Sequence, residues 1–414
     1  MDKIMIMGAG IYQVPLIKTA KRMGLETIVA SIPGNYPGFA LADKVYYINT
    51  TDQEAILKVV REEGIAGICT AGTDVAVATI GYVNQQLGLS GVCREAAAKT
   101  SDKTLMQDTF KAGNVASARH IKADYPEAAR AAAAEIGYPV VVKCVDSSGS
   151  RGISIVETEA ELDDAFEDAL RYSRRPYALV EQKLPGREIG IDGIVENGEL
   201  VFLAPHQKYV YQSGETVITA GHDFPYEGSP ALMEDLRRQT QRAVRALGLD
   251  NCAVNLDAFV DGDHLYVIEI GGRSGATCIP ELISMYYGFD YYEMILRLAL
   301  GRKVDCRGQE DCAPCTARLI MSPADGVITG YDQTGLETLR EEGVQIGLDY
   351  AAGDAIEAMR NGTDRLGQVI AAVSGDEEMK RLMRRVHRCI EIDGRSLETL
   401  WDEADADIQG PEEA

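Results

Sequence analysis

The sequence predicts an α/β and α+β protein, with a Rossmann-like domain at the N-terminus, a central α+β region and a small C-terminal α/β domain. Three observations predict this class. Strand-like and helix-like segments alternate over residues 3–92, which is typical of a doubly wound parallel sheet. Pairs of strand-like runs separated by Gly-rich turns fill much of residues 138–276, and short mixed elements return beyond Gly301. A chain of 414 residues is long enough for two or three domains with their own cores.

Composition narrows the class of function. The formal net charge of −23 argues against binding to nucleic acid or anionic lipid, since both need clustered Lys and Arg. The N-terminal run Met1 to Met7 is too short for a signal-peptide core, and no run reaches the length of a membrane span. We therefore expect a cytoplasmic protein that acts on small molecules.

The first elements are expected to be the strand Lys3 to Met7, the tight turn Gly8 to Gly10 and an amphipathic helix from Tyr12 to Gly24. Further strands are expected at 25–30, 42–48 and 65–70, and a helix at 52–64. Glycines in such a turn let a dinucleotide pyrophosphate approach a helix N-terminus. The third glycine of that fingerprint is absent, however, because position 13 is Gln, and no acidic residue ends the second strand. A Rossmann-like domain without a nicotinamide cofactor is the favoured interpretation.

Residues 94–136 are expected to be helical, with Asp102 as a cap-type residue before a helix from Lys103 to Lys111. A strand, a Ser/Gly-rich loop and a second strand follow between Tyr138 and Val156. Lys143 lies inside the first of these strands, where a lysine is normally unfavourable. The loop could direct backbone N–H groups and hydroxyl groups at an anion, and the alternative is a plain hairpin with a mobile tip. Its candidate residues are Ser147, Ser148, Gly149, Ser150 and Gly152.

The next segments are expected to be a helix over 159–171, two strands within Tyr177 to Val195 and a strand from Glu199 to Ala204. Residues 210–230 are rich in Gly, Ser and Tyr, and we expect a long loop there that could serve as a lid. His206 and Lys208 precede it and could reach a substrate; the alternative is an ordinary strand end. An amphipathic helix is expected over 232–247.

A hairpin is predicted over residues 253–276, with its turn at Asp261-Gly262-Asp263. Asp257 and Glu269 are acids within its two apolar strands, and burying a carboxylate is costly unless it is paired or holds a metal. Two such acids, followed by Arg273 in a Gly/Ser-rich segment, suggest a hard cation beside a phosphate. The alternative is that both acids face solvent.

Beyond Gly301, helices are expected around Glu337 to Arg340 and Glu377 to Arg388, and residues 402–414 are expected to be a solvated acidic tail. Cys306, Cys312 and Cys315 could suggest zinc or redox chemistry, but no further CxxC or His pair completes a four-ligand set.

In order, these pieces resemble the ATP-grasp superfamily. The resemblance is carried by Lys103, Val140-Val-Val-Lys143 with its loop, Val180-Glu181, Gly186-Arg-Glu188 and the acids that end in Glu269-Ile-Gly-Gly-Arg273. The most similar branch contains L-amino-acid ligases, the ATPase subunit of aminoimidazole ribonucleotide carboxylase, biotin carboxylase and carbamoyl-phosphate synthetase. The resemblance implies a Rossmann-like pre-domain (1–95), an ATP-grasp domain of two α+β lobes (96–300, with a nucleotide lid lobe at about 115–180), a C-terminal α/β domain (301–402) and an acidic tail (403–414).

The resemblance also implies roles for residues that match the family's motifs. Lys103 and Lys143 would hold the phosphates of ATP, and residues 147–152 would close over them, with Ser148, Gly149, Ser150 and Gly152 as ligands. Glu181 would accept a hydrogen bond from the adenine amino group, the backbone near Leu184 would contact the ring edge, and Glu188 would bind the ribose. Asp257 and Glu269 would hold magnesium, and Arg273 would stabilise the acyl-phosphate, with Lys143 as a second catalytic cation.

Two positions depart from the family's pattern. Many relatives have Glu-x-Asn-x-Arg, whereas Gly271 stands in the place of Asn here, so a second magnesium would lose a side-chain ligand. Asp257 is shorter than the Glu that is common at its position. The expected cofactors are therefore ATP with one or two Mg²⁺ ions, with Mn²⁺ as an alternative.

The resemblance implies an ADP-forming carboxylate–amine ligase that activates a carboxylate as an acyl-phosphate and couples it to an amine, with amino-acid or dipeptide-type substrates. A bicarbonate-using or purine-pathway carboxylase or synthetase is the alternative, and a nucleotide-binding regulator without activity is a third reading. The expected partners are small-molecule carboxylates and amines, with no nucleic acid and no membrane, and the expected assembly is a homodimer.

Overall fold

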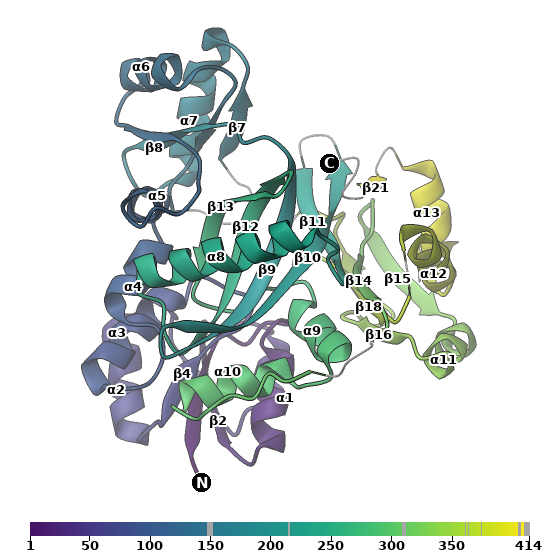
Figure 1. The fold of residues 1–414 in the computed structure, drawn as a ribbon. Helices are drawn as coiled ribbons and strands as arrows, with labels where there is room; N and C mark the ends of the chain where they lie inside the picture. Colours follow the sequence, from purple (N-terminus) through teal and green to yellow (C-terminus); the bar gives the residue numbers. More distant parts are fainter. Residues whose placement is uncertain are drawn as a thin grey trace. The chain divides into compact units, whose positions relative to one another are not determined.

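The computed structural model describes residues 1–146, 152–213, 216–308, 312–360, 362, 364–373, 375–404 and 407–409. The predicted α/β and α+β class is confirmed (Figure 1). The chain divides into two compact units, each assembled from three segments. The first comprises residues 1–204, 228–276 and 290–306, and the second comprises residues 205–227, 277–289 and 307–414.

The N-terminal part of the first unit is a parallel sheet in the order β3-β2-β1-β4. Apolar side chains such as Met5, Met7 and Ile28 form its core. The strand order reverses at β1, so the crevice at the carboxyl ends of β1 and β4 is the switch point of this sheet. The strands are β1 (Lys3–Met7), β2 (Glu26–Ser31), β3 (Lys44–Tyr47) and β4 (Gly67–Cys69), and the helices are α1 (Val14–Arg22), η1 (Pro37–Ala40), α2 (Gln53–Glu63), α3 (Val77–Leu87) and the later α10 (Tyr291–Ala299).

The turn after β1 is closed by the side chain of Gln13. Its Oε1 accepts a hydrogen bond from the backbone N–H of Gly10 at 2.9 Å, and its Nε2 donates to the carbonyl of Ala71 at 2.6 Å. A Cβ on Gly8 would lie 2.9 Å from that Oε1. The glutamine that breaks the dinucleotide fingerprint therefore ties the turn after β1 to the loop after β4.

An antiparallel sheet in the order β5-β8-β6-β7 forms a separate lobe, which we call the lid lobe. Helices α6 and α7 pack their apolar faces against it, as Figure 1 shows. Residues 94–136 were predicted to be helical, but residues 113–125 between α5 and α6 are not, and they include the strand β5. Helices α4 (Arg94–Thr100) and α5 (Lys103–Ala112) precede this lobe and pack against α3, α8 and β13. The elements of the lobe are β5 (His120–Ala123), α6 (Pro126–Ile136), β6 (Val140–Lys143), β7 (Ile153–Val156), η2 (Glu159–Glu161), α7 (Leu162–Tyr172) and β8 (Ala178–Gln182).

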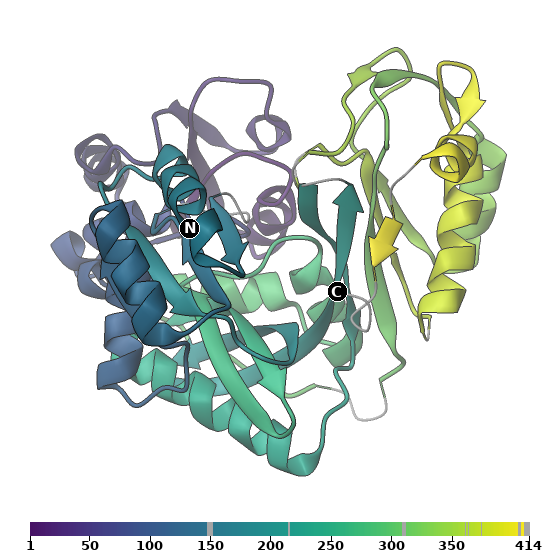
Figure 2. The ribbon, with the colours of Figure 1, turned by 90° about the horizontal axis from the view of Figure 1, so that it is seen from above.

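A second antiparallel sheet of the first unit contains β9 (Arg187–Glu196), β12 (Cys252–Asp261), β13 (His264–Gly271) and the beginning of β10 (Glu199–Ser213). Its order is β13-β12-β9-β10. Helix α8 (Pro230–Leu247) runs along one face of these strands, as both views show (Figures 1 and 2). The predicted hairpin is confirmed, with its turn at Gly262.

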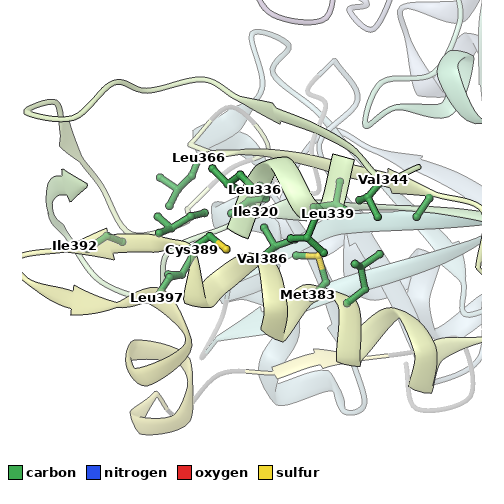
Figure 3. Close-up of a cluster of buried hydrophobic side chains, with 14 of the residues drawn as sticks. Ile320, Leu336, Leu339, Val344, Leu366, Met383, Val386, Cys389, Ile392 and Leu397 are labelled. Atoms are coloured by element: carbon green, nitrogen blue, oxygen red, sulfur yellow. The ribbon is translucent and has the colours of Figure 1, made fainter. Parts of the chain in front are cut away.

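The second unit contains a sheet in the order β10-β11-β14-β18-β16 and a small sheet in the order β17-β15-β19-β20. Apolar residues from both sheets, α11 and α12 form its core (Figure 3). The elements are β11 (Thr216–Phe224), α9 (Ile279–Tyr287), β14 (Cys315–Ile320), β15 (Gly326–Tyr331), α11 (Gln333–Glu341), β16 (Gln345–Leu348), β17 (Ala355–Ile356), β18 (Gly367–Ala371), α12 (Asp376–Arg388), β19 (Ile390–Ile392), β20 (Arg395–Ser396), α13 (Leu397–Glu403) and β21 (Asp407–Gln409).

The loop predicted over residues 210–230 is wrong. Residues 210–230 do not form a long loop, because β10 and β11 pair as a hairpin through most of this stretch. Its Val, Thr, Ile and Tyr residues favour strands, and this preference prevails over its Gly and Ser content. Near the C-terminus, α13 extends to the exposed Glu403, and β21 pairs with β10, with Ile408 opposite Tyr211.

Among the described residues, no helix is both long and apolar enough to cross a membrane.

Candidate active site

The β12–β13 hairpin brings two carboxylates together. Asp257 and Glu269 are direct partners in the register, immediately before a bulge at Ala258. Alternate residues of β12 such as Leu256 are buried, whereas Asn255 and Asp257 are only partly buried on the opposite face. Directly opposed carboxylates repel each other unless a cation lies between or beside them. This face of the hairpin is therefore built for positive charge.

Three cationic side chains supply that charge in the structure. Lys103 Nζ lies 3.0 Å from Glu269 Oε2, and the Glu269 side chain is still 37% exposed. The Lys103 charge is the main reason why the pKa of Glu269 falls to about 2; burial opposes the fall, and Lys143 and Arg273 add to it. Burial works against the charge of Lys103, but Glu269 raises the pKa of Lys103 overall. Glu269 is thus held ionised among cations.

Helix α5 places Lys103 at this point. Asp102 caps the helix, its Oδ1 accepting hydrogen bonds from the N–H groups of Thr104 and Leu105 at 2.9 and 3.2 Å. One turn further along, Gln107 Nε2 donates to the carbonyl of Ile268 at 3.1 Å. Because residues four apart lie on one helix face, this bond fixes Lys103 beside the residue that follows Ile268.

Lys143 and Glu181 form a buried ion pair in the lid lobe. They lie on adjacent strands, since Lys143 pairs with Leu179 and Val141 pairs with Glu181. Lys143 Nζ is 2.6 Å from Glu181 Oε2, and the two side chains are only 4% and 6% exposed. Glu181 Oε1 is buried without a hydrogen-bond partner among the described residues. An orphaned buried acceptor of this kind suits a ligand that donates a hydrogen bond.

The loop predicted to bind phosphate is described only at its ends. Ser147, Ser148, Gly149, Ser150 and Arg151 lie outside the described residues. Gly152 is described: it has a φ of +65°, and its carbonyl accepts a hydrogen bond from the N–H of Cys144 at 2.8 Å. The two ends of the loop are therefore joined directly after Lys143.

The linker between β8 and β9, together with the start of β9, carries the other expected nucleoside ligands. Leu184 is half-buried, and Glu188 is an exposed residue of β9 opposite Phe259. Gly186 between them has a φ of +88°, and a Cβ there would lie 2.0 Å from the carbonyl oxygen of Val260. The linker therefore lies directly against β12, and only glycine fits at its end.

Arg273 is held by a network that the sequence did not predict. Its Nε and Nη2 each donate to Asp74, its Nη1 donates to Asn255 Oδ1, and all three distances are 2.7 Å. Asn255 Nδ2 in turn donates to Asp192, a fully buried residue of β9, at 2.8 Å. Burial opposes the charge of Arg273, but Asp74, then Asp192 and Asp257, raise its pKa.

Two signals in the sequence could have identified these acids. Asp192 interrupts the apolar run Ile189 to Val195 just as Asp257 interrupts its own strand. Asp74 follows β4, at the carboxyl end of a parallel strand, where ligand-binding residues gather.

His206 and Lys208 belong to the second unit, on β10. His206 is 1% exposed and contacts His222 edge-on, with ring centroids 4.6 Å apart. Burial lowers the pKa of His222 well below its usual value. His206 is thus part of a core in that unit.

The carboxylates fit a magnesium ion. Asp257 and Glu269 offer oxygen donors on one face, and Mg²⁺ usually takes one or two carboxylates together with substrate phosphates. Among the described residues, no cluster of three or more His, Cys, Asp or Glu side chains could hold a metal by itself. Two carboxylates would leave ligand positions on such an ion for phosphate oxygens.

Comparisons with known proteins agree with this architecture. Residues 111–299 match the family described as D-ala D-ala ligase C-terminus. Phosphoribosylglycinamide synthetase from Anaerococcus prevotii is 28% identical with a TM-score of 0.80, and the match covers 94% of this chain and 99% of that one. L-amino acid ligase from Bacillus licheniformis is 18% identical with a TM-score of 0.75, over 95% of this chain and 98% of that one.

A third similar structure contains ligands. It is the biotin carboxylase domain of the 2-oxoglutarate carboxylase from Hydrogenobacter thermophilus, in complex with MgADP, ADP and bicarbonate. It is 20% identical with a TM-score of 0.75, and the match covers 98% of this chain and 94% of that one. The fold and the family match together define an ATP-grasp ligase architecture. The chain thus has the fold of these proteins, residues 111–299 match the ligase family, and the resemblance predicted from the sequence is confirmed.

Proposed function

We propose that this protein is an ADP-forming ligase that joins a carboxylate to an amine, with amino-acid or dipeptide-type substrates. One observation carries the proposal. Lys103 and Arg273 converge with the Asp257–Glu269 pair in one unit, and Lys143 also acts on the charge of Glu269. Phosphoryl transfer is catalysed mainly by positioning and by cations placed where charge develops. This arrangement supplies both.

The proposed roles follow from the donors and charges. Lys103 and Lys143 bind phosphate oxygens of ATP once these replace their present partners, Glu269 and Glu181. Glu181 accepts a hydrogen bond from the adenine amino group, and Leu184 and Glu188 contact the nucleoside. Asp257 and Glu269 hold magnesium, which when bound neutralises phosphate charge.

The reaction needs no nucleophile from the protein. A substrate carboxylate oxygen attacks the γ-phosphorus, the bond to the β-phosphate oxygen breaks, and ADP leaves. An amine nitrogen then attacks the acyl carbon of the acyl-phosphate, phosphate departs and the nitrogen loses a proton. Arg273 stabilises the negative charge that develops on the acyl-phosphate and its tetrahedral successor.

The test is a screen of ADP release with amino acids singly and in pairs. Bicarbonate alone and glycine with a phosphorylated amino sugar serve as separate arms. Release that requires both a carboxylate and an amine supports the ligase, whereas release with bicarbonate alone would reject it in favour of a carboxylase. The amino-sugar arm is included because the similarity to phosphoribosylglycinamide synthetase, at 28% identity, favours a purine-type synthetase as the second candidate.

Glu269→Ala is the control for the metal assignment. It should abolish magnesium-dependent ADP release, and unchanged release would reject that assignment. We also propose a homodimer that needs no nucleic acid or membrane, which size-exclusion chromatography with light scattering will test.

A further inference from the structure

The guanidinium of Arg273 is almost fully committed within the protein. Four hydrogen bonds, two to Asp74, one to Asn255 and one to the carbonyl of Ser274, use four of its five N–H donors. Within the part of the chain that the structure describes, one N–H on Nη2 remains for a ligand. The side chain is 15% exposed, so its direction is set by these protein partners.

Asp74 is the partner that makes two of these bonds. The paired bonds, from Nε to Oδ1 and from Nη2 to Oδ2, fix the plane of the guanidinium as well as its distance. Asp74 itself is fixed by its turn, since its carbonyl accepts a hydrogen bond from the N–H of Val77 at 3.0 Å. The Gly72 N–H also donates to the carbonyl of Ser274 at 3.3 Å. The loop after β4 therefore bonds both to Arg273, through Asp74, and to the residue that follows it.

Gly271 and Asp74 use the same space. A Cβ on Gly271 would lie 3.0 Å from Asp74 Oδ1 and 3.7 Å from Arg273 Cζ. To admit a Cβ at position 271, the Asp74 carboxylate would have to shift by a few tenths of an ångström. The glycine that departs from the Glu-x-Asn-x-Arg pattern is thus matched to an aspartate 197 positions earlier in the sequence.

We propose that Asp74 is a positioning residue for Arg273, and that Gly271 leaves room for the Asp74 carboxylate in this arrangement. Asp74 holds the guanidinium plane from the Rossmann-like domain, while Asn255, itself bonded to Asp192, holds it from the strands. The proposal rests on the proposed function insofar as Arg273 acts on the reacting phosphate. A catalytic cation fixed before the substrate arrives needs no reorganisation during the reaction.

Kinetics of Asp74→Asn test this role. The amide keeps the size of the side chain but loses the charge and one acceptor oxygen. We expect kcat to fall about 100-fold, as a misplaced catalytic group typically produces, while the KM for ATP stays within about threefold because the lysines are untouched. Asp2→Asn, which removes the 2.5 Å ion pair to Arg302 elsewhere in this unit, is the matched control and should leave both constants unchanged. An Asp74→Asn enzyme with wild-type kcat would overturn the proposal.

A second measurement does not depend on activity. The Nε–H signal of Arg273, assigned by its loss in Arg273→Lys, should exchange slowly with water in the wild type and rapidly in Asp74→Asn. If exchange is unchanged, Asp74 does not hold Arg273, whatever the substrate. If exchange rises but no carboxylate and amine pair supports ADP release, the proposed function fails and the positioning role stands.

The shared space is tested by a double-mutant cycle. Gly271→Asn alone should lower the melting temperature and free the Arg273 Nε–H. Combined with Asp74→Ala it should cost less than the sum of the two single changes, because the new side chain then has room. Additive losses would show that the two positions are independent and would reject the pairing of Asp74 with Gly271.

Discussion

Lys143 and Glu181 form a buried ion pair inside the lid lobe. Removing one partner of a buried pair leaves an uncompensated charge, which typically costs about 3–5 kcal/mol. The two side chains are almost completely buried, so this range applies here. The pair is therefore a structural element as well as a proposed part of the nucleotide site.

We predict that Lys143→Met destabilises the protein by an amount within that range and abolishes ATP turnover. Glu181→Gln in the same chain should recover most of the stability, because the orphaned charge is removed, without restoring turnover. Urea titration of the single and double variants measures the first effect and ADP release measures the second. A double variant no more stable than Lys143→Met would contradict the coupling.

At the residue scale, the sequence predicts the acids and cations that interrupt apolar strands. Asp257, Glu269 and Lys143 stand out because burying a charge is costly, and the structure brings Asp257 and Glu269 together. Asp74 and Asn255 do not stand out in this way. Asp74 lies in a turn, where Asp is ordinary, and its contact with Arg273 spans 199 positions. Only the tertiary structure reveals such a pair.

At the element scale, α5 illustrates how a helix cap can serve a site. We predict that Asp102→Ala destabilises the protein by about 1 kcal/mol through loss of the cap. It should also raise the KM for ATP, because Lys103 is the first residue of the helix. Asp102→Asn, which keeps an acceptor oxygen for the cap, is the matched control and should retain wild-type affinity. An unchanged KM in the alanine variant would show that the cap does not position Lys103.

Helix α12 carries a buried histidine that should make the second unit acid-sensitive. His387 is 7% exposed and stacks on Trp401, with ring centroids 6.0 Å apart, and burial lowers its pKa from 6.5 to about 4. Since the folded pKa lies below the unfolded value, protonation favours the unfolded chain. The contribution of neutral His387 is complete above pH 6.5 and is lost as the pH falls through about 4.

We predict that urea midpoints fall between pH 6.5 and 4 in the wild type more steeply than in His387→Phe, which keeps an aromatic ring. The difference should be at most on the order of 3 kcal/mol by linkage. Trp401 is the only tryptophan in the chain and stacks on His387, so its fluorescence reports on unfolding around this histidine. Parallel pH profiles of the two proteins would rule out His387 as the cause.

The elements themselves were largely predictable where hydrophobic periodicity is strong. The parallel strands β1, β2 and β3, the capped α5 and the β12–β13 hairpin follow from local pattern and turn chemistry. The first part of β10 was predicted, but its continuation and β11 were missed because Gly, Ser and Tyr suggest a loop, while their pairing depends on partners such as β14 that lie far along the sequence. Strand β21 was missed because its partner, β10, also lies far away in the sequence.

At the scale of the whole molecule, the second unit is discontinuous, and its three segments are separated by parts of the first. Strand β11 pairs with β14, and α9 packs against both. We predict that a chain ending at residue 306 is poorly soluble, because residues 205–227 and 277–289 then keep apolar surface without its partners. Expression yield and light scattering of this chain and of the full chain measure the effect. A soluble, monodisperse chain ending at residue 306 would contradict this dependence.

Such interleaving was not predictable from composition or periodicity, since linear boundaries were expected near residues 95 and 300. Segment 277–289 resembles any other amphipathic helix in the sequence. Its membership of the second unit is decided by packing against β11 and β14.

The five points at which the chain passes between units, after residues 204, 227, 276, 289 and 306, also set an order for biosynthesis. During translation the first unit has all its segments once residue 306 has left the ribosome. The hairpin of β10 and β11 has by then waited through some eighty residues of synthesis without β14, and it finds that partner only as the last quarter of the chain emerges. Nascent chains of this protein thus expose a β-strand edge for longer than a protein of consecutive domains would, and chaperones that cover such edges should act late in its synthesis.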